Sequence, residues 1–420
     1  MSYQLQIESL AYGGAGVGRR EGRAVFVEGA APGDLLDVEP QPGRKSPLRA
    51  RLLSVVQPGP GRVEPICPHY GDCGGCQWQH VDPAAQLEAK RRSLEDALLR
   101  VGKISREDLP QIQAVAAPSQ WRYRRRARLA VASDGRLGFM ARGSNRVVRI
   151  KSCDLLEPDL ERLALALSEA LATRPIAGLA AVELCIADGK DAVELELGEG
   201  SNVAEARARA ADLLEALPQL AGIVVSSKHE RITVGDPVLR DGPLLLRPDV
   251  FAQASREGNR ALVALAVEAL AARPTDPALE LYCGSGNFSF AIAPQVASLL
   301  AIEDEGAALA LAKRALPAEL VSRVSFRELP VVEALREEAA RGARFQVALL
   351  DPPRAGAKEV VAMLAALVER RIVYVSCDPA TLARDVAEFF RLGWKPLRAT
   401  VLDLFPQTYH LEAVIVLERR

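Results

Sequence analysis

Long apolar runs are missing from this 420-residue sequence. Their absence excludes a membrane-spanning helix, which needs about 18–20 consecutive apolar residues. The first residues, Met1-Ser-Tyr-Gln-Leu-Gln, also lack the basic region and apolar core of a signal peptide. We therefore expect a cytoplasmic protein whose seven cysteines are thiols or metal ligands rather than disulfides.

Two nucleotide-binding motifs are incomplete. Gly284 and Gly286 follow an apolar strand and precede a helix, but Ser289 stands where a dinucleotide motif has its third glycine. No Lys-Ser or Lys-Thr pair follows to form a phosphate loop. The segment could be an ordinary turn without a ligand. A loop that binds S-adenosylmethionine, a cofactor with an adenosine and an amino-acid end but no phosphates, is the better interpretation. Glu303 ends the next strand, where a carboxylate can accept hydrogen bonds from ribose hydroxyls.

The length indicates two or three domains, and the 49% hydrophobic and 25% charged fractions are those of a soluble globular protein. From about residue 257 the pattern alternates helix and strand, which predicts an α/β fold with a doubly wound, Rossmann-like parallel sheet. Short strands separated by turns predict a small N-terminal β-barrel, and the Gly13–Gly18 segment is expected to be one of its corners. The predicted domains are 1–58 (barrel), 59–245 (central α+β domain) and 246–420 (catalytic domain).

Positive charge is concentrated in residues 121–151, which contain ten basic residues against the single acid Asp134. Trp121 and Tyr123 lie among the arginines and could stack on bases. This pattern favours a nucleic-acid surface over a solvated, charge-rich strand face. The ten residues are Arg122, Arg124, Arg125, Arg126, Arg128, Arg136, Arg142, Arg146, Arg149 and Lys151.

Reactive side chains follow three apolar strands. Cys377 ends the run Arg371–Ser376, and Asp378-Pro379 then stops the strand and opens a helix. Asp351 stands at another strand end, before two prolines, where open α/β sheets bind their ligands. Glu412 enters an apolar strand, and a carboxylate buried there would be a general base with a raised pKa.

A methyl donor, a nucleophilic cysteine and a basic carboxylate together match one reaction closely: methylation of carbon 5 of a pyrimidine. A thiolate that adds to carbon 6 makes carbon 5 nucleophilic, and a base then removes the carbon 5 proton so that the cysteine can leave. The Pro-Cys motif of DNA cytosine methyltransferases is absent.

The sequence resembles the RNA (uracil-5-)-methyltransferase family, in particular its 23S ribosomal RNA branch, over nearly its whole length. The resemblance is carried by Tyr282-Cys-Gly-Ser-Gly-Asn-Phe288, Asp351-Pro-Pro-Arg-Ala-Gly356, Ser376-Cys-Asp-Pro-Ala-Thr-Leu-Ala-Arg-Asp385 and His410-Leu-Glu412. It implies Cys377 as nucleophile, Glu412 as base, and a TRAM domain, an RNA-binding barrel, at residues 1–57. It further implies that S-adenosylmethionine contacts Gln253, Tyr282, Asn287, Glu303 and Asp351. The sequence departs from the family at Ser255, usually Asn, and at Glu328, where Asn or Asp is commoner.

Cysteines 67, 73 and 76 form a Cys-x5-Cys-x2-Cys cluster, and Cys153 follows the basic block. Four thiolates suit an iron–sulfur cluster or zinc, and Cys76-x3-His80 is itself a plausible zinc spacing. The family resemblance implies a [4Fe-4S] cluster held by Cys67, Cys73, Cys76 and Cys153. Cys185 is expected in the core, and Cys283 is expected to be a small apolar residue at a strand end.

The expected substrate is an unstacked uridine of 23S ribosomal RNA. A transfer RNA substrate is the first alternative; the barrel and the four cysteines argue against it because the family's transfer RNA enzymes generally lack both. A non-catalytic RNA-binding iron–sulfur protein is the second alternative, and such a protein would need neither Cys377 nor Glu412. No obligate protein partner is evident, so we expect a monomer.

Overall fold

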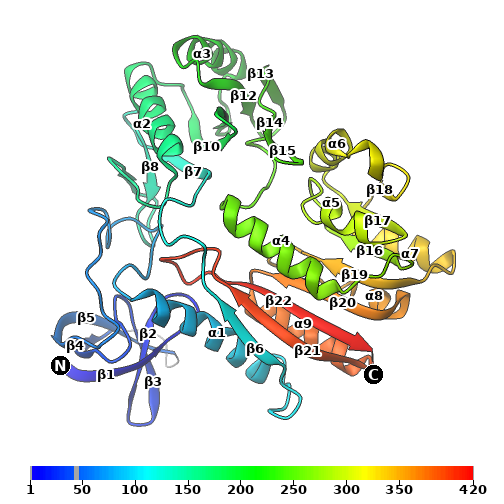
Figure 1. The fold of residues 1–420 in the computed structure, drawn as a ribbon. Helices are drawn as coiled ribbons and strands as arrows, with labels where there is room; N and C mark the ends of the chain where they lie inside the picture. Colours follow the sequence, from blue (N-terminus) through cyan, green and yellow to red (C-terminus); the bar gives the residue numbers. More distant parts are fainter. Residues whose placement is uncertain (1, 42–46, 420) are drawn as a thin grey trace.

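A barrel and two large β-sheets make up most of the fold in the computed structural model, which describes residues 2–41 and 47–419. A closed barrel comes first, a seven-stranded sheet second and an eight-stranded sheet last (Figure 1). Within the described residues no helix is both long and apolar enough to cross a bilayer.

The N-terminal barrel confirms the predicted small all-β unit. Alternate side chains such as Leu5, Ile7 and Val25 fill its interior, as the period of two in a strand requires. The glycine-rich segment forms a turn and then a strand that the sequence did not predict. The strands are β1 (Tyr3–Leu10), β2 (Gly16–Arg20), β3 (Arg23–Val27), β4 (Leu35–Pro40) and β5 (Leu48–Gln57).

The central sheet has the strand order β13-β12-β11-β10-β7-β8-β9. Its apolar face packs with helices α2 (Pro158–Thr173) and α3 (Val203–Ala216) in one core cluster. A short hairpin, β14 (Leu239–Asp241) with β15 (Leu244–Leu246), leads into the last unit. The sheet strands are β7 (Arg126–Val131), β8 (Leu137–Met140), β9 (Val147–Arg149), β10 (Leu179–Ala187), β11 (Lys190–Leu197), β12 (Leu220–Ser226) and β13 (Arg231–Gly235).

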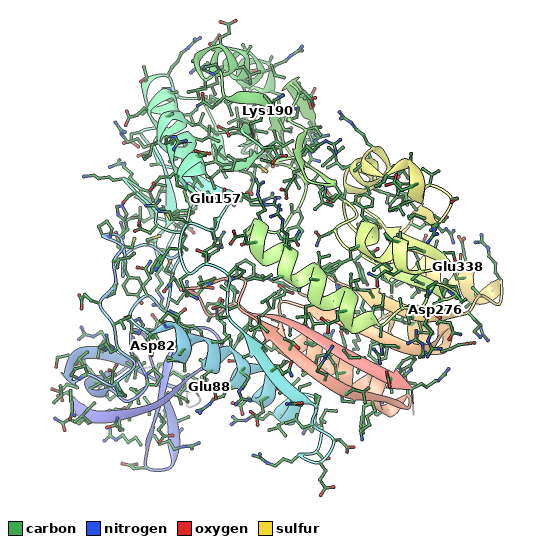
Figure 2. The ribbon with its side chains drawn as sticks, viewed as in Figure 1. Asp82, Glu88, Glu157, Lys190, Asp276 and Glu338 are labelled. Carbon is green, nitrogen blue, oxygen red and sulfur yellow. The ribbon has the colours of Figure 1, made fainter. Side chains whose placement is uncertain are left out.

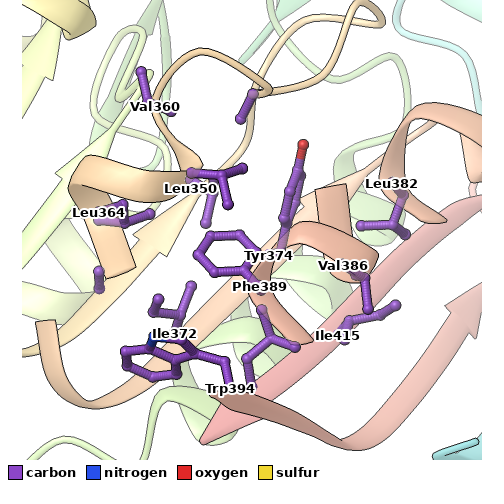
Figure 3. Close-up of a cluster of buried hydrophobic side chains, with 14 of the residues drawn as sticks. Leu350, Val360, Leu364, Ile372, Tyr374, Leu382, Val386, Phe389, Trp394 and Ile415 are labelled. Atoms are coloured by element: carbon purple, nitrogen blue, oxygen red, sulfur yellow. The ribbon is translucent and has the colours of Figure 1, made fainter. Parts of the chain in front are cut away.

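The C-terminal sheet confirms the predicted doubly wound α/β pattern, with separate apolar clusters formed by its buried residues. Figure 3 shows the cluster that contains Tyr374, Phe389 and Trp394. Its first five strands are parallel: β18 (Val324–Glu328), β17 (Ser298–Glu303), β16 (Pro277–Leu281), β19 (Phe345–Leu350) and β20 (Val368–Ser376). An antiparallel pair follows, β22 (Glu412–Arg419) and β21 (Trp394–Leu402). The helices are α4 (Arg256–Leu270), α5 (Ser289–Ile292), α6 (Gly306–Ala315), α7 (Val331–Ala340), α8 (Val361–Leu367) and α9 (Pro379–Arg391).

The C-terminal sheet also recruits an earlier part of the chain. Strand β6 (Gln111–Val115) pairs in parallel with β21 and forms the sheet edge. Helix α1 (Pro83–Arg100) places Leu94 and Leu98 in the same core cluster as residues of α9. Both segments lie within the predicted 59–245 domain, so the physical unit around the C-terminal sheet is larger than residues 246–420. The domain division itself stays a prediction.

Helix α1 begins and docks through polar contacts. Asp82 caps its N-terminus by accepting hydrogen bonds from the amides of Ala84 and Ala85, at 2.9 and 3.1 Å (Figure 2). Farther along, Lys90 Nζ is fully buried and lies 2.6 Å from Asp403 Oδ1 and 3.0 Å from the Phe405 carbonyl. An ion pair removed from water in this way is costly to break by removing one partner only.

Replacing Lys90 with Ala should lower the free energy of unfolding by about 3–5 kcal/mol, because Asp403 would keep a buried, unpaired charge. Urea denaturation followed by circular dichroism measures the change. Arg92→Ala in the same helix is the matched control: Arg92 pairs with Glu88 at 2.7 Å in an exposed position, so its loss should cost about 0.5 kcal/mol or less. Equal losses of unfolding free energy in the two variants would contradict the larger contribution expected of the buried pair.

Candidate active site

One cavity of about 560 Å³ opens at the carboxyl ends of the central parallel strands. Apart from the four cysteines of the proposed cluster, all the predicted site residues line it: Gln253, Tyr282, Asn287, Glu303, Asp351, Cys377 and Glu412. Their convergence follows from topology, because β16, β17, β19 and β20 run parallel and their ends meet at one edge. The cavity brings the residues together; their roles stay predictions.

The turn after β16 has the backbone geometry of a ligand-binding loop. Tyr282, Gly284 and Gly286 have φ of 62°, 54° and 88°, in the left-handed region that glycine tolerates best. The Gly284 amide donates to Glu303 Oε2 at 2.8 Å, and the amides of Asp304 and Glu305 donate to its Oε1 at 2.9 Å. The Glu303 carboxylate is thereby fixed beside the loop.

Ser289, at the missing third glycine, has a structural partner. Its hydroxyl donates to Glu280 Oε2 at 2.6 Å beneath the loop. Burial raises the pKa of Glu280 to about 8. Sequence reasoning missed Asn259, which lines the cavity and exchanges amide hydrogen bonds of 2.7 and 3.0 Å with Asn287. It lies inside a helix in no motif, so no sequence signal marked it.

The loop that follows Asp351 is held by helix α9. Asp385 accepts hydrogen bonds from the Tyr374 hydroxyl at 2.8 Å and from the Ala357 amide at 2.7 Å. The Thr381 hydroxyl donates to the Arg354 carbonyl at 3.1 Å. Arg354 itself lines the cavity. It lies in the Asp351–Gly356 motif but was not predicted as a site residue.

Acidic groups dominate the electrostatics of the cavity. Burial raises the pKa of Asp351 to about 7. Burial, and then the charge of Asp351, raises the pKa of Glu412 well above its usual range. Glu412 is only 3% exposed, and a carboxylate with a raised pKa is a stronger base than one in water. The positive charge of Arg354 opposes the rise in the pKa of Glu412.

Cys377 directly follows β20 and is partly buried. Burial, then the negative charge of Glu412, raises the pKa of the thiol to about 11. Arg354 acts in the opposite direction through its charge and a side-chain hydrogen bond. Cys185 is 1% exposed, which confirms that it belongs to the core, and Cys283 is 2% exposed and packs in an apolar cluster at its strand end.

The four predicted cluster cysteines also come together, around a separate cavity of about 230 Å³. Burial raises the pKa of Cys73 and Cys153, and that of Cys76 to about 12. Among residues 2–41 and 47–419, no three or more His, Cys, Asp or Glu side chains are arranged to hold a single metal ion. His80 does not line this cavity, and its Nδ1 lies 2.5 Å from the Tyr70 hydroxyl.

Most of the basic block takes part in ion pairs, and its role towards nucleic acid stays a prediction. Acids from other segments pair with seven of its ten residues: Arg122, Arg125, Arg126, Arg128, Arg136, Arg142 and Arg146. Arg149 pairs with Asp134 within the block. Tyr123 is 5% exposed and donates to the Pro406 carbonyl, so it cannot stack on a base. Arg124 lies 5.9 Å from the Phe405 ring centroid, and both residues line the active-site cavity.

The raised pKa of Cys377 predicts slow alkylation of the free protein at neutral pH and a reaction that accelerates as pH rises towards about 11, because only the thiolate reacts. Arg354→Gln should slow alkylation further at any fixed pH, since it removes the positive charge that favours the thiolate. Iodoacetamide labelling, quantified for the Cys377 peptide by mass spectrometry, measures both. Lys358→Gln, which removes an exposed charge in the same connection, is the control. Faster labelling of Arg354→Gln would contradict the assigned role.

Comparison with known proteins gives full-length relatives. A 23S rRNA (uracil(1939)-C(5))-methyltransferase of Dechloromonas aromatica is 34% identical, with 98% of this chain and 99% of that protein covered. The protein of the same description from Klebsiella pneumoniae strain 342 is also 34% identical, covering 97% and 93%.

The family model described as tRNA (Uracil-5-)-methyltransferase matches residues 244–420, and the TRAM domain matches residues 2–53. A solved Pyrococcus abyssi tRNA (uracil-54, C5)-methyltransferase, in complex with S-adenosyl-L-homocysteine, shares the fold with a TM-score of 0.72 and 23% identity, over 99% of this chain and all of that one. The fold is thus that of an S-adenosylmethionine-dependent methyltransferase with an N-terminal TRAM barrel. The chain belongs to the RNA (uracil-5-)-methyltransferase family.

Proposed function

We propose that this protein methylates carbon 5 of a uridine in 23S ribosomal RNA, the uridine at position 1939 for which its relatives are named. The observation that carries the proposal is that Cys377 and Glu412 face one cavity together with the loop formed by Tyr282–Gly286. A thiol and a buried carboxylate with a raised pKa are the nucleophile and base that this reaction requires.

The cofactor side of the cavity fits S-adenosylmethionine. Gln253, Tyr282, Asn287, Glu303 and Asp351 would hold it, and the fixed Glu303 carboxylate suits a ribose diol. When bound, the cofactor supplies the methyl group that carbon 5 receives.

The protein's own residues carry the remaining steps. The Cys377 thiolate bonds to carbon 6 of the uracil, and the electrons of the carbon 5–carbon 6 double bond move towards oxygen 4, which makes carbon 5 nucleophilic. After carbon 5 is methylated, Glu412 removes its proton. The electrons of that carbon–hydrogen bond restore the double bond as the carbon 6–sulfur bond breaks, and Cys377 leaves as a thiolate. The positive charge of Arg354 favours the Cys377 thiolate both when it attacks carbon 6 and when it leaves.

The choice of ribosomal over transfer RNA rests on the relatives that are 32–34% identical over the full chain. The barrel does not separate the two substrates, contrary to the sequence-based argument, because the Pyrococcus abyssi tRNA enzyme matches 99% of this chain. That match is 23% identical and bears on the fold alone.

We further propose that Cys67, Cys73, Cys76 and Cys153 hold a [4Fe-4S] cluster. Four thiols around one cavity support it, and cysteine thiolates are the ligands that hold such clusters. His80 faces Tyr70 instead, which weighs against zinc. The cluster would stabilise the fold of the central domain. The whole protein would be a cytoplasmic monomer with three domains, residues 1–58, 59–245 and 246–420.

Replacing Cys377 with Ala should reduce methyl transfer to below detection, because no nucleophile remains to activate carbon 5. The assay follows labelled methyl groups into 23S ribosomal RNA that lacks this modification. Glu412→Gln should instead accumulate a covalent protein–RNA adduct, visible as a retarded band on a denaturing gel. Cys185→Ala, a change at a core cysteine, is the control and should stay active. Methylation by Cys377→Ala would rule out this mechanism, and a missing adduct would place the base elsewhere.

Anaerobically purified protein should be brown and contain about four iron atoms per chain, as four-cysteine ligation of this cluster requires. Cys76→Ala should lose most of the iron and the visible absorbance and melt at a lower temperature, whereas Cys185→Ala should keep all three. A colourless protein containing zinc would contradict the proposal.

A further inference from the structure

The glycine-rich corner of the barrel is the one sequence motif that the proposed function leaves unused. It connects β1 to β2, and its Gly13 and Gly14 have φ of 100° and 95°, which other residues adopt at a cost. A β-carbon added at Gly14 would lie 3.1 Å from the Gln77 side chain and 3.4 Å from the Tyr409 ring. The corner is therefore shaped for close approach to other parts of the chain.

Its contacts fix the corner against the catalytic unit. The Gly14 carbonyl accepts a hydrogen bond from Trp78 Nε1 at 3.0 Å. The Trp78 amide in turn donates to the Gln407 carbonyl at 3.0 Å, in the loop that leads to Glu412. Leu10, Trp78 and Ala89 share one small apolar cluster, against which Tyr409 packs. Barrel, cysteine segment, α1 and catalytic loop thus meet at this point.

This docking presents Tyr12 at the catalytic strand end. Its hydroxyl lies 3.5 Å from the carbonyl oxygen of Cys377. Its ring meets Tyr409 edge-on, with centroids 5.4 Å apart and planes at 83°. Burial raises the pKa of Tyr12, so its hydroxyl stays neutral. Arg354, which lines the cavity, lies close enough to oppose that rise through its charge.

The aromatic contacts continue from Tyr12 into the cavity. Tyr409 lies over His410 with centroids 4.3 Å apart, and His410 meets Phe405 at 6.1 Å. His410 and Phe405 line the cavity. Tyr12, at the outer end of this series, is 38% exposed even though both its hydroxyl and one ring neighbour are engaged. A fixed aromatic ring with an open surface is the group on which proteins stack unpaired bases.

We propose that Tyr12 is an RNA-positioning residue: its exposed ring stacks on a base that flanks the target uridine and holds the RNA strand at the mouth of the cavity. The inference rests on the proposed function. A flipped uridine leaves its neighbours without stacking partners on one side, and a ring beside Cys377 can replace one of those partners. Tyr12 takes no part in bond making, so it should act on RNA binding rather than on chemistry.

The test is steady-state methyl transfer to a 23S ribosomal RNA fragment by a series of Tyr12 variants. Tyr12→Phe and Tyr12→Trp keep a stacking ring and should stay within about twofold of the parent in KM for RNA. Tyr12→Leu keeps bulk without an aromatic face and should raise that KM roughly 5- to 150-fold, the effect of one lost base–aromatic stack. In all variants kcat, KM for S-adenosylmethionine and the melting temperature should change little. Leu53→Ala, at an exposed apolar position of β5, is the barrel control.

A second readout reports stacking directly. With 2-aminopurine next to the target uridine, binding of Tyr12→Phe should quench its fluorescence as the parent does, and binding of Tyr12→Leu should quench it less. Equal KM values for the Leu and Phe variants would overturn the proposal, since packing alone would then suffice. A fall in kcat that persists in Tyr12→Phe would also overturn the proposal. It would show that Tyr12 acts through the contact of its hydroxyl with the Cys377 carbonyl and not by stacking. A parent protein that leaves the fragment unmethylated would contradict the proposed function as well.

Discussion

The buried pair of Lys90 and Asp403 is the constraint on which the geometry of the site depends. It fastens helix α1 to the loop that joins β21 to β22. Gln86 strengthens the same junction: its amide donates to Gln407 Oε1 at 3.0 Å, and its side-chain oxygen accepts from the Gln407 amide at 2.9 Å. Since Gln407 has a φ of 70°, this loop takes an unusual path that needs external support. The loop leads directly into β22, where Glu412 pairs with Leu402.

Around that anchored loop the protein concentrates carboxyl groups. Glu280, Asp351 and Glu412 all have a raised pKa, and burial is the first cause in each case. A buried acid is costly for stability, and proteins keep such groups where their chemistry is used. Arg354 opposes the rise in pKa of both reacting groups, Cys377 and Glu412. One arginine therefore acts on nucleophile and base together, while burial remains the larger influence on each.

Much of this site could be predicted from the sequence because the rule that parallel strands present ligand-binding residues at their carboxyl ends is local. Cys377, Asp351 and Glu303 each follow an apolar run, and a run is visible in the sequence. Contacts between residues far apart along the chain are not visible in it. Arg125 meets Asp241 from 116 positions away, and such pairs offset much of the positive charge that the sequence concentrates in this block. Strand β6 was missed for the same reason, since its partner β21 lies nearly 300 residues later.

The position of β6 has a consequence for how the chain is made. A ribosome releases the N-terminal part of a protein first, and domains generally fold as they emerge. Here β6 emerges early, while its partner β21 follows nearly 300 residues later. Until then β6 is an unpaired strand able to join the wrong edge. Nascent chains of this protein are therefore exposed to misassembly at β6 for as long as the intervening residues take to be made.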